Sequence, residues 1–137
     1  MAREKKRIVS GRTMQLSIEC EDRPGTLARL TRIIGRAKAN IVAISCAPVG
    51  VLGTLHVVVD DVDRVKKILN REGVSYTEQE VLRVEMPNLP GSLGEFAEKL
   101  TKQDVNITTA YGSASRGSKR ATVIFKVSDL EKAASIR

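Results

Sequence analysis

The sequence predicts an α+β protein of two tandem ferredoxin-like sandwiches, each an antiparallel sheet with helices on one face. One segment, DRPGTLARL at residues 22–30, returns as NLPGSLGEF at residues 88–96. Around each copy, residues alternate in strand-like or helix-like periods in the order strand-helix-strand-strand-helix-strand. The expected domains are residues 13–79 and 80–137, after a basic N-terminal tail at residues 1–12.

The first copy opens with a strand at residues 13–20, where apolar and polar residues alternate. A turn at residues 21–26 interrupts it. Pro24 cannot donate to a strand ladder, and Gly25 tolerates unusual backbone dihedral angles. The alternation therefore predicts a strand with one buried face, and Pro24 and Gly25 predict that the strand ends at this turn.

A helix follows the turn, because apolar residues recur at helical spacing from Leu27 to Ala37. Thr26 is its expected cap, and Asn40 is the residue expected to end it in a left-handed conformation. The first copy then continues as a strand, a hairpin turn, a strand, a helix that Gly73 closes and a short last strand, at residues 41–49, 50–53, 54–60, 62–69 and 74–77.

The second copy repeats this order but stops early. Its expected elements are a strand at 81–86, a helix at 93–100, hairpin strands at 107–115 and 119–127, and a helix at 129–137. Asp61 and Asp129 stand at corresponding places as caps of the second helices. The last strand is missing, so either the chain is truncated or a strand comes from elsewhere, with Ile8-Val9-Ser10 and a partner chain as candidates.

Exposed sheet surfaces predict an assembly, most simply a homodimer. An open sheet edge invites pairing. An apolar set is also expected on the outward faces of the sheets: Val42, Ile44, Val58 and either Val123 or Ile124. We therefore expect the sheets to be extended or faced by a neighbour.

The composition excludes several classes of protein. The formal charge of the 137 residues is +7, and the first twelve hold five basic residues against Glu4 alone. A basic tail indicates either a solvated mobile end or a contact with nucleic acid or an anionic surface. Cys20 and Cys46 have no close-spaced partner, so no metal site, cofactor or disulfide framework is expected. No apolar signal or membrane segment is found, which favours the cytoplasm.

Catalysis is not expected. The single histidine, His56, lies within a predicted strand, where a satisfied hydrogen bond is its simplest role. A pair with Cys20 is conceivable, but nothing orients the histidine or supplies an oxyanion site. RNA binding is the rival binding class, since the RNA-recognition motif shares this element order; that module stacks bases on aromatic side chains of its central strands, where this chain has only Phe125. Nucleic acid is therefore not the expected partner.

The repeated turn-and-helix segments resemble the ACT domain, a small regulatory module that usually senses amino acids. The similarity rests on Pro-Gly before an amphipathic helix and on an Asn fifteen residues after the Gly, and it covers nearly the whole chain. The resemblance implies that an amino acid binds where two such domains meet, lined by the turn and by the Asn that opens the next strand. The implied residues are Asn88, Leu89, Gly91, Ser92 and Asn106 in the second copy and Asp22, Arg23, Gly25, Thr26 and Asn40 in the first.

The second copy is favoured as the ligand site, because it keeps both amides, Asn88 and Asn106, whereas the first has Asp22 in place of the turn Asn. Free backbone N–H groups at a helix start suit the ligand carboxylate. The expected function is non-catalytic sensing of an amino acid that changes assembly or partner contacts. A dimerisation or scaffold module that regulates a partner enzyme is the alternative.

Overall fold

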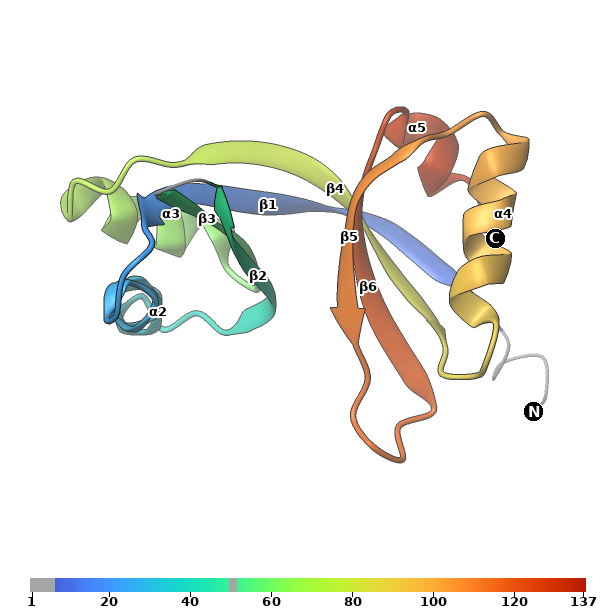
Figure 1. Ribbon diagram of the computed structural model, residues 1–137, viewed down its shortest axis with the longest axis horizontal. Helices are drawn as coiled ribbons and strands as arrows, with labels where there is room; N and C mark the ends of the chain where they lie inside the picture. The colour runs from blue at the N-terminus through green and yellow to red at the C-terminus, as the bar shows by residue number, and fades with distance from the viewer. Residues whose placement is uncertain (1–6, 50–51) are drawn as a thin grey trace. The chain divides into compact units, whose positions relative to one another are not determined.

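The computed structural model describes residues 7–49 and 52–137, and within them six strands and four helices form (Figure 1). The strands are β1 (Val9–Glu21), β2 (Ile41–Val49), β3 (Leu52–Val59), β4 (Thr77–Pro87), β5 (Ile107–Ser113) and β6 (Arg120–Val127). The helices are α2 (Thr26–Arg36), α3 (Val62–Arg71), α4 (Ser92–Lys102) and α5 (Leu130–Ala134). The α+β class and the expected order of elements are confirmed for this part of the chain.

The chain divides into two compact units. The first unit is Met14–Gln79, and the second combines the described residues up to Thr13 with Glu80–Arg137. Hydrogen-bonded strands follow the order β2-β3-β1-β4-β6-β5. Because β1 and β4 each cross the division, the first unit has the order β2-β3-β1-β4 and the second has β1-β4-β6-β5. This is the four-stranded order of one βαββαβ unit, present twice.

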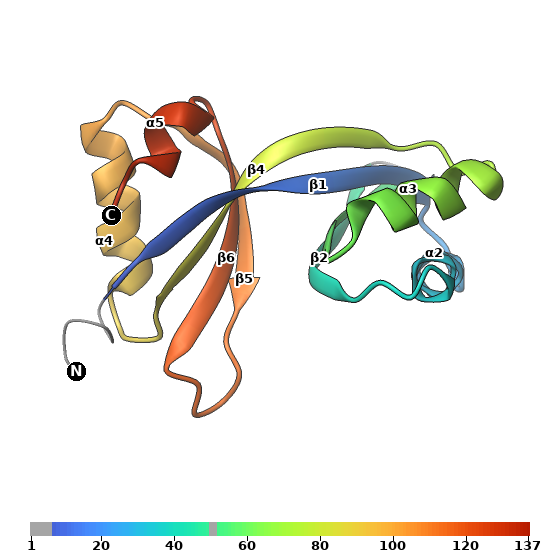
Figure 2. The same ribbon diagram turned by 180° about the vertical axis from the view of Figure 1, so that it is seen from behind.

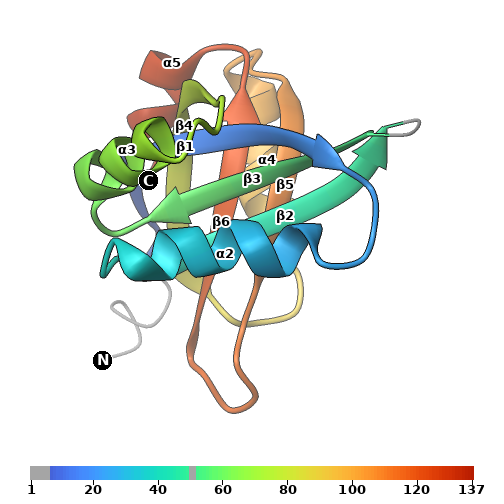
Figure 3. The ribbon, with the colours of Figure 1, turned by 90° about the vertical axis from the view of Figure 1, so that its left-hand side faces the viewer.

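The first unit buries the inward residues of its strands under two helices. Figure 3 shows β1, β3 and β2 side by side with α2 in front of them. Alternate residues of β1 and β3 meet the apolar stripes of α2 and α3 in one core, as the periodicity of the sequence predicts. Its fully buried members include Leu16, Ile18, Leu30, Ile33, Ile34, Leu55, Val57, Val65 and Leu69.

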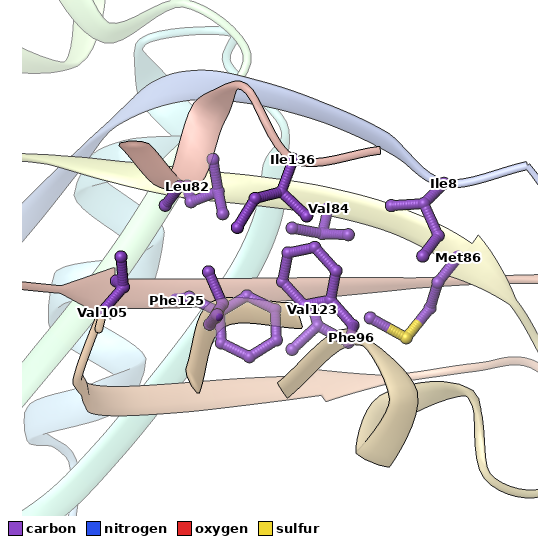
Figure 4. Close-up of a cluster of buried hydrophobic side chains, with 11 residues drawn as sticks. Ile8, Leu82, Val84, Met86, Phe96, Val105, Val123, Phe125 and Ile136 are labelled. Carbon is purple, nitrogen blue, oxygen red and sulfur yellow. The ribbon is translucent and has the colours of Figure 1, made fainter. Parts of the chain in front are cut away.

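The second unit packs α4 and α5 on the same face of its strands, as opposite views show (Figures 1 and 2). The expected inward set of β4, namely Leu82, Val84 and Met86, is buried there. Phe96 and Phe125 form the centre, with ring centroids 5.3 Å apart. Ile8 joins this cluster and points into it beside Met86 (Figure 4).

The start of β1 supplies the strand that the second copy lacks in sequence order. Ile8 is 9% exposed within the second core, and Ser10 Oγ donates to the carbonyl of Ile136 at 3.4 Å. Of the expected sources of this strand, Ile8-Val9-Ser10 is the one that the structure shows. Val9–Arg12, which the sequence analysis placed in a basic tail, are therefore part of a strand; residues 1–6 lie outside the described residues.

Three local expectations are wrong. The N-cap of α2 is Gly25 and not Thr26, because Gly25 adopts a left-handed conformation with φ 92° and makes Thr26 the first helical residue. The left-handed residue after the helix is Lys38, at φ 61°, because the helix already ends at Arg36. Residues 74–76 are irregular, so the strand expected at 74–77 starts only at Thr77.

The strand registers show which face of the sheet each residue of the expected outward set occupies. Ile44 pairs with Val57, which lies in the core, so Ile44 is on the helix-covered side of β2 and not on the outward face. It stays 42% exposed there. Val123 lies in the second core, which leaves Ile124 as the outward residue of that pair. The expected hairpin turn at 50–53 is partly outside the described residues, and Gly53 already belongs to β3.

Candidate functional site

Both Pro-Gly turns start a helix in the same unusual way. Gly25 and Gly91 are left-handed N-caps with φ 92° and 89°, and neither helix start receives a hydrogen bond from a capping side chain in the described part of the chain. The turns occupy one amide each: Thr26 N–H donates to the Arg23 carbonyl at 3.4 Å, and Ser92 N–H donates to the Leu89 carbonyl at 3.2 Å. The next amides of each helix start are left for water or a ligand.

The two helix starts differ in charge. The first turn of α2 contains no acidic residue, and it is flanked by Arg23 and Arg29. The corresponding positions of the second unit, 66 residues later, are Leu89 and Glu95, and Glu95 lies in the first turn of α4. A helix N-terminus carries a partial positive charge that favours anions. Glu95 therefore complements the start of α4, whereas α2 has Arg29 at that position and no acidic residue in its first turn.

A pocket of about 430 Å³ lies against the start of α2. We call it the turn pocket. Its walls come from the end of β1, the first turns of α2 and the loop after α3, with the lining residues Ile18, Glu19, Cys20, Glu21, Arg23, Thr26, Arg29, Leu30, Glu72, Gly73, Val74 and Ser75. Its volume falls within the range of small-molecule sites.

Both signs of charge meet at the turn pocket. Arg23 Nε lies 2.8 Å from Glu21 Oε2, and both side chains are largely exposed. Arg36 Nη1 lies 3.3 Å from Glu72 Oε1. A carboxylate can approach Arg23, Arg29 and the open helix start, while the glutamates suit an ammonium group. The pocket therefore presents basic and acidic side chains side by side.

The turn asparagine of the second unit has a structural partner. Asn88 Nδ2 donates to the carbonyl of Ser118 at 2.9 Å, and Asn88 N–H donates to the carbonyl of Lys119 at 3.0 Å. Both bonds join the turn to the hairpin between β5 and β6. In the first unit Asp22, at the corresponding position, is exposed. The second unit, which the sequence favoured as the ligand site, is therefore the one whose turn asparagine already donates its side-chain amide to the protein.

The strand asparagines do not meet the turns of their own units. Asn40 precedes Ile41, which pairs with Val59, whereas Asp22 follows Glu21, which pairs with Leu52. Seven strand residues separate these two ends, or about 23 Å. The same holds for Asn106 and Asn88, since Ile107 pairs with Val127 and Pro87 with Arg120. The turn and the strand asparagine of one unit therefore do not form a single site within that unit.

Asn40 and Asn106 instead join the start of one strand to the end of its neighbour. Asn40 N–H and Nδ2 donate to the two carboxylate oxygens of Asp60, at 2.9 and 3.3 Å. Asn106 N–H donates to Ser128 Oγ at 2.9 Å. In return, the backbone carbonyl of Asn40 accepts from the backbone N–H of Asp60, and that of Asn106 accepts from the backbone N–H of Ser128. Their recurrence in the sequence thus reflects a repeated strand junction.

Cys20 and His56, whose pairing the sequence left conceivable, lie on opposite faces of the sheet. His56 pairs with Ser17 across β1 and β3, and its Nδ1 lies 2.8 Å from Ser17 Oγ and 3.3 Å from Gln15 Nε2. Cys20 pairs with Gly53 and contributes to the core face, the opposite side of the sheet from Ser17. The histidine has the satisfied strand position that the sequence predicted.

Two parts of this region have no local signal in the sequence. Arg29 carried no motif, and its placement becomes evident only when the two copies are aligned and Glu95 is seen in its place. Loop residues 72–75 join the pocket through the tertiary fold, which no local pattern indicates. Across residues 7–49 and 52–137, no three His, Cys, Asp or Glu side chains gather to hold a metal ion. No helix there has the length and apolar character to cross a membrane.

Residues 14–72 match the family model of the ACT domain. No curated protein matches the chain. Among solved structures, the protein BT0572 from Bacteroides thetaiotaomicron is similar over 90% of this chain and 85% of its own, with 27% identity and a TM-score of 0.83.

Two further structures share the fold. The regulatory subunit of aspartate kinase from Thermus thermophilus, in its ligand-free form, has a TM-score of 0.67 at 14% identity. Aspartokinase alpha and beta subunits have a TM-score of 0.66 at 16% identity. Each alignment covers 86% of this chain and 85% of the other, so the likeness extends beyond the segment that the family model matches.

Proposed function

Residues 14–72 match the ACT-domain family, and on that premise we propose that the chain is a non-catalytic regulatory protein that binds a free amino acid in the turn pocket of the first unit. One observation carries the proposal: the start of α2 has no side-chain cap and no acidic first-turn residue, yet Arg23 and Arg29 flank it. Positive charge at a helix N-terminus is unfavourable unless an anion is bound.

The ligand carboxylate binds the open amides of α2 and the two arginines. Gly25 permits a close approach because it has no side chain. The ammonium group is held by Glu21, with Asp22 nearby on the same turn. The loop at residues 72–75 encloses the ligand side chain and determines which amino acid fits.

The turn of the second unit is proposed to have a structural role. Asn88 secures the neighbouring hairpin, and Glu95 already complements the helix start, so Leu89, Gly91 and Ser92 bind no ligand. The tandem arrangement then couples one sensing unit to one unit that mediates assembly. Ligand binding shifts the assembly, or the contact with a partner enzyme, through its differential affinity for two states.

Thermal shift and calorimetry with each of the twenty amino acids test this proposal. We expect a small set of amino acids to raise the melting temperature and the corresponding 2-hydroxy acids, which lack the ammonium group, to bind more weakly. Arg23→Leu and Arg29→Glu each introduce the residue of the second unit. Either change should weaken binding by about 10-fold or more, since a hydrogen bond to a charged group contributes about 1.5–3 kcal/mol.

The matched control is Leu89→Ala, which alters the same position of the second turn and should leave affinity unchanged. If none of the twenty amino acids binds at millimolar concentration, the sensing role is refuted and the scaffold alternative is favoured. If simple anions such as sulfate bind as well as any amino acid, the pocket recognises charge alone.

A further inference from the structure

The two cysteines, 26 residues apart in the sequence, line one small pocket. Its volume is about 150 Å³, and it lies between the first turn of α2 and the edge strand β2. We call it the thiol pocket. Cys20 is half-buried and Cys46 is exposed, and both are free thiols. Asp22, Arg23 and Thr26 line the same pocket.

The strand register turns both thiols toward the helix-covered face. Cys20 pairs with Gly53, and Cys46 pairs with Leu55, a core residue. Gly53 has no side chain to separate them, and Cys20 Sγ donates to its carbonyl at 3.6 Å. Burial raises the pKa of the Cys20 thiol, and the nearby Cys46 thiol adds to the rise. The two sulfur atoms are therefore neighbours within one pocket.

A disulfide does not suit this geometry. Cys20 is on β1 and Cys46 on β2, and β3 lies between these strands. Two strand spacings amount to about 9–10 Å between the backbones. Two cysteines whose Cα atoms are more than about 7 Å apart cannot be bridged without backbone movement. A metal ion bound between the two sulfur atoms can span a longer distance than a disulfide bond does.

The number of available protein ligands indicates which metal ion fits this pocket. Structural zinc takes four ligands, and the described residues supply no group of three near one another. Thiolates are soft ligands that favour Cu(I), a closed-shell ion that accepts two sulfur ligands. Coordination by both cysteines forms a bis-thiolate complex of net charge −1. The start of α2 and the Arg23 guanidinium favour that charge, whereas the Glu21 and Asp22 carboxylates, which line the same pocket, oppose it.

We infer that Cys20 and Cys46 form a two-coordinate site for a soft monovalent metal ion, Cu(I), at the start of α2. Each thiol loses its proton to solvent, one sulfur–metal bond forms at each cysteine, and no electron is transferred. The affinity rises with pH because two protons are released. Cys20, Arg23 and Thr26 also line the turn pocket, so metal binding alters the amino-acid site next to it.

The test is a Cu(I) titration of the full chain under anaerobic conditions against a Cu(I) chelator of known affinity. We expect one ion per chain, two sulfur neighbours by X-ray absorption, and a gain in affinity from pH 6 to pH 8. Cys46→Ser and Cys20→Ala should each lower the affinity at least 100-fold. Cys46 is exposed, so its variant should fold normally, and circular dichroism checks this for both.

A matched control keeps the number of thiols. The double variant Ser45→Cys with Cys46→Ser moves one thiol to the position that pairs with His56, on the other face of β2. It should lose the tight site as Cys46→Ser does. Equal affinity of the parent and this variant would overturn the inference, as would one ion per two chains with metal-dependent dimers. No amino acid is present in this titration, so its result is independent of the proposed sensing function.

Discussion

The two units share one fold, yet they differ in how the chain builds them and in how their first helices are stabilised. The first unit is continuous from Met14 to Gln79, whereas the second takes its last strand from the start of β1. The start of α4 has an acidic residue in its first turn, and the start of α2 has none. A repeated fold thus does not imply a repeated site, because the charges around an identical turn determine what it can bind.

The largest expected effect tests the continuity of the units. A fragment of residues 14–79 should fold alone, because all of its strands and helices come from that segment. A fragment of residues 80–137 should remain unfolded, because it lacks Ile8 and an edge strand. Circular dichroism and thermal melting distinguish these outcomes.

Fusing residues 7–13 behind Arg137 through a flexible linker should restore cooperative melting of the second fragment. Cooperative folding of residues 80–137 without this addition would contradict the assignment of β1 to both units.

The next effect concerns the positions of Gly112 and Cys46, which correspond in the two copies. A Cβ at Gly112 would lie 2.5 Å from the Thr122 carbonyl oxygen and 2.9 Å from Val123 Cα. Gly112→Ala should therefore lower the free energy of unfolding by about 1–3 kcal/mol. Cys46→Ala should change it by less than about 0.5 kcal/mol, because Cys46 is exposed.

Urea unfolding measures both variants. Gly94→Ala is a suitable control for the glycine substitution, because its added Cβ meets nothing within 4 Å. A cost at Gly112 no larger than at Gly94 would show that the strands separate easily there.

The third prediction uses the two left-handed glycines. Gly25→Ala and Gly91→Ala should each cost about 1–2 kcal/mol of stability, because φ near 90° strains any residue with a Cβ. Only Gly25→Ala should also weaken amino-acid binding, because it adds a methyl group at the turn that binds the carboxylate. Calorimetry on both variants separates the shared strain from the binding effect; equal loss of affinity in both would contradict the choice of the first unit.

The smallest effect concerns the ligand-free protein. Arg29→Glu should raise its free energy of unfolding by about 0.3–1 kcal/mol, because an acidic residue suits a helix start. Glu95→Arg should lower it by a similar amount. Urea unfolding at low salt measures both, and high salt should reduce both changes. Changes of the same sign at the two positions would show that the helix dipole does not govern these sites.

Periodicity predicted most of the fold. Buried Leu82, Val84 and Met86, and the capping bonds of Asp61 and Asp129 to the amides of Arg64 and Lys132, follow from local patterns. The source of the last strand of the second unit could not be predicted in this way, because local periodicity does not indicate which distant segments pair. The site was predicted less well: the turns were found, but the 66-residue spacing of Asn40 and Asn106 is explained by the strand junctions that both residues form.

Calorimetry of the unmodified chain and Arg23→Leu, with the amino acid that most raises the melting temperature, tests amino-acid binding at the start of α2 most directly. We expect saturable binding to the unmodified chain, with one ligand per chain, and at least a 10-fold loss in Arg23→Leu, while Leu89→Ala binds normally. Undiminished binding in Arg23→Leu, or a loss confined to Leu89→Ala, would contradict the turn pocket as the site.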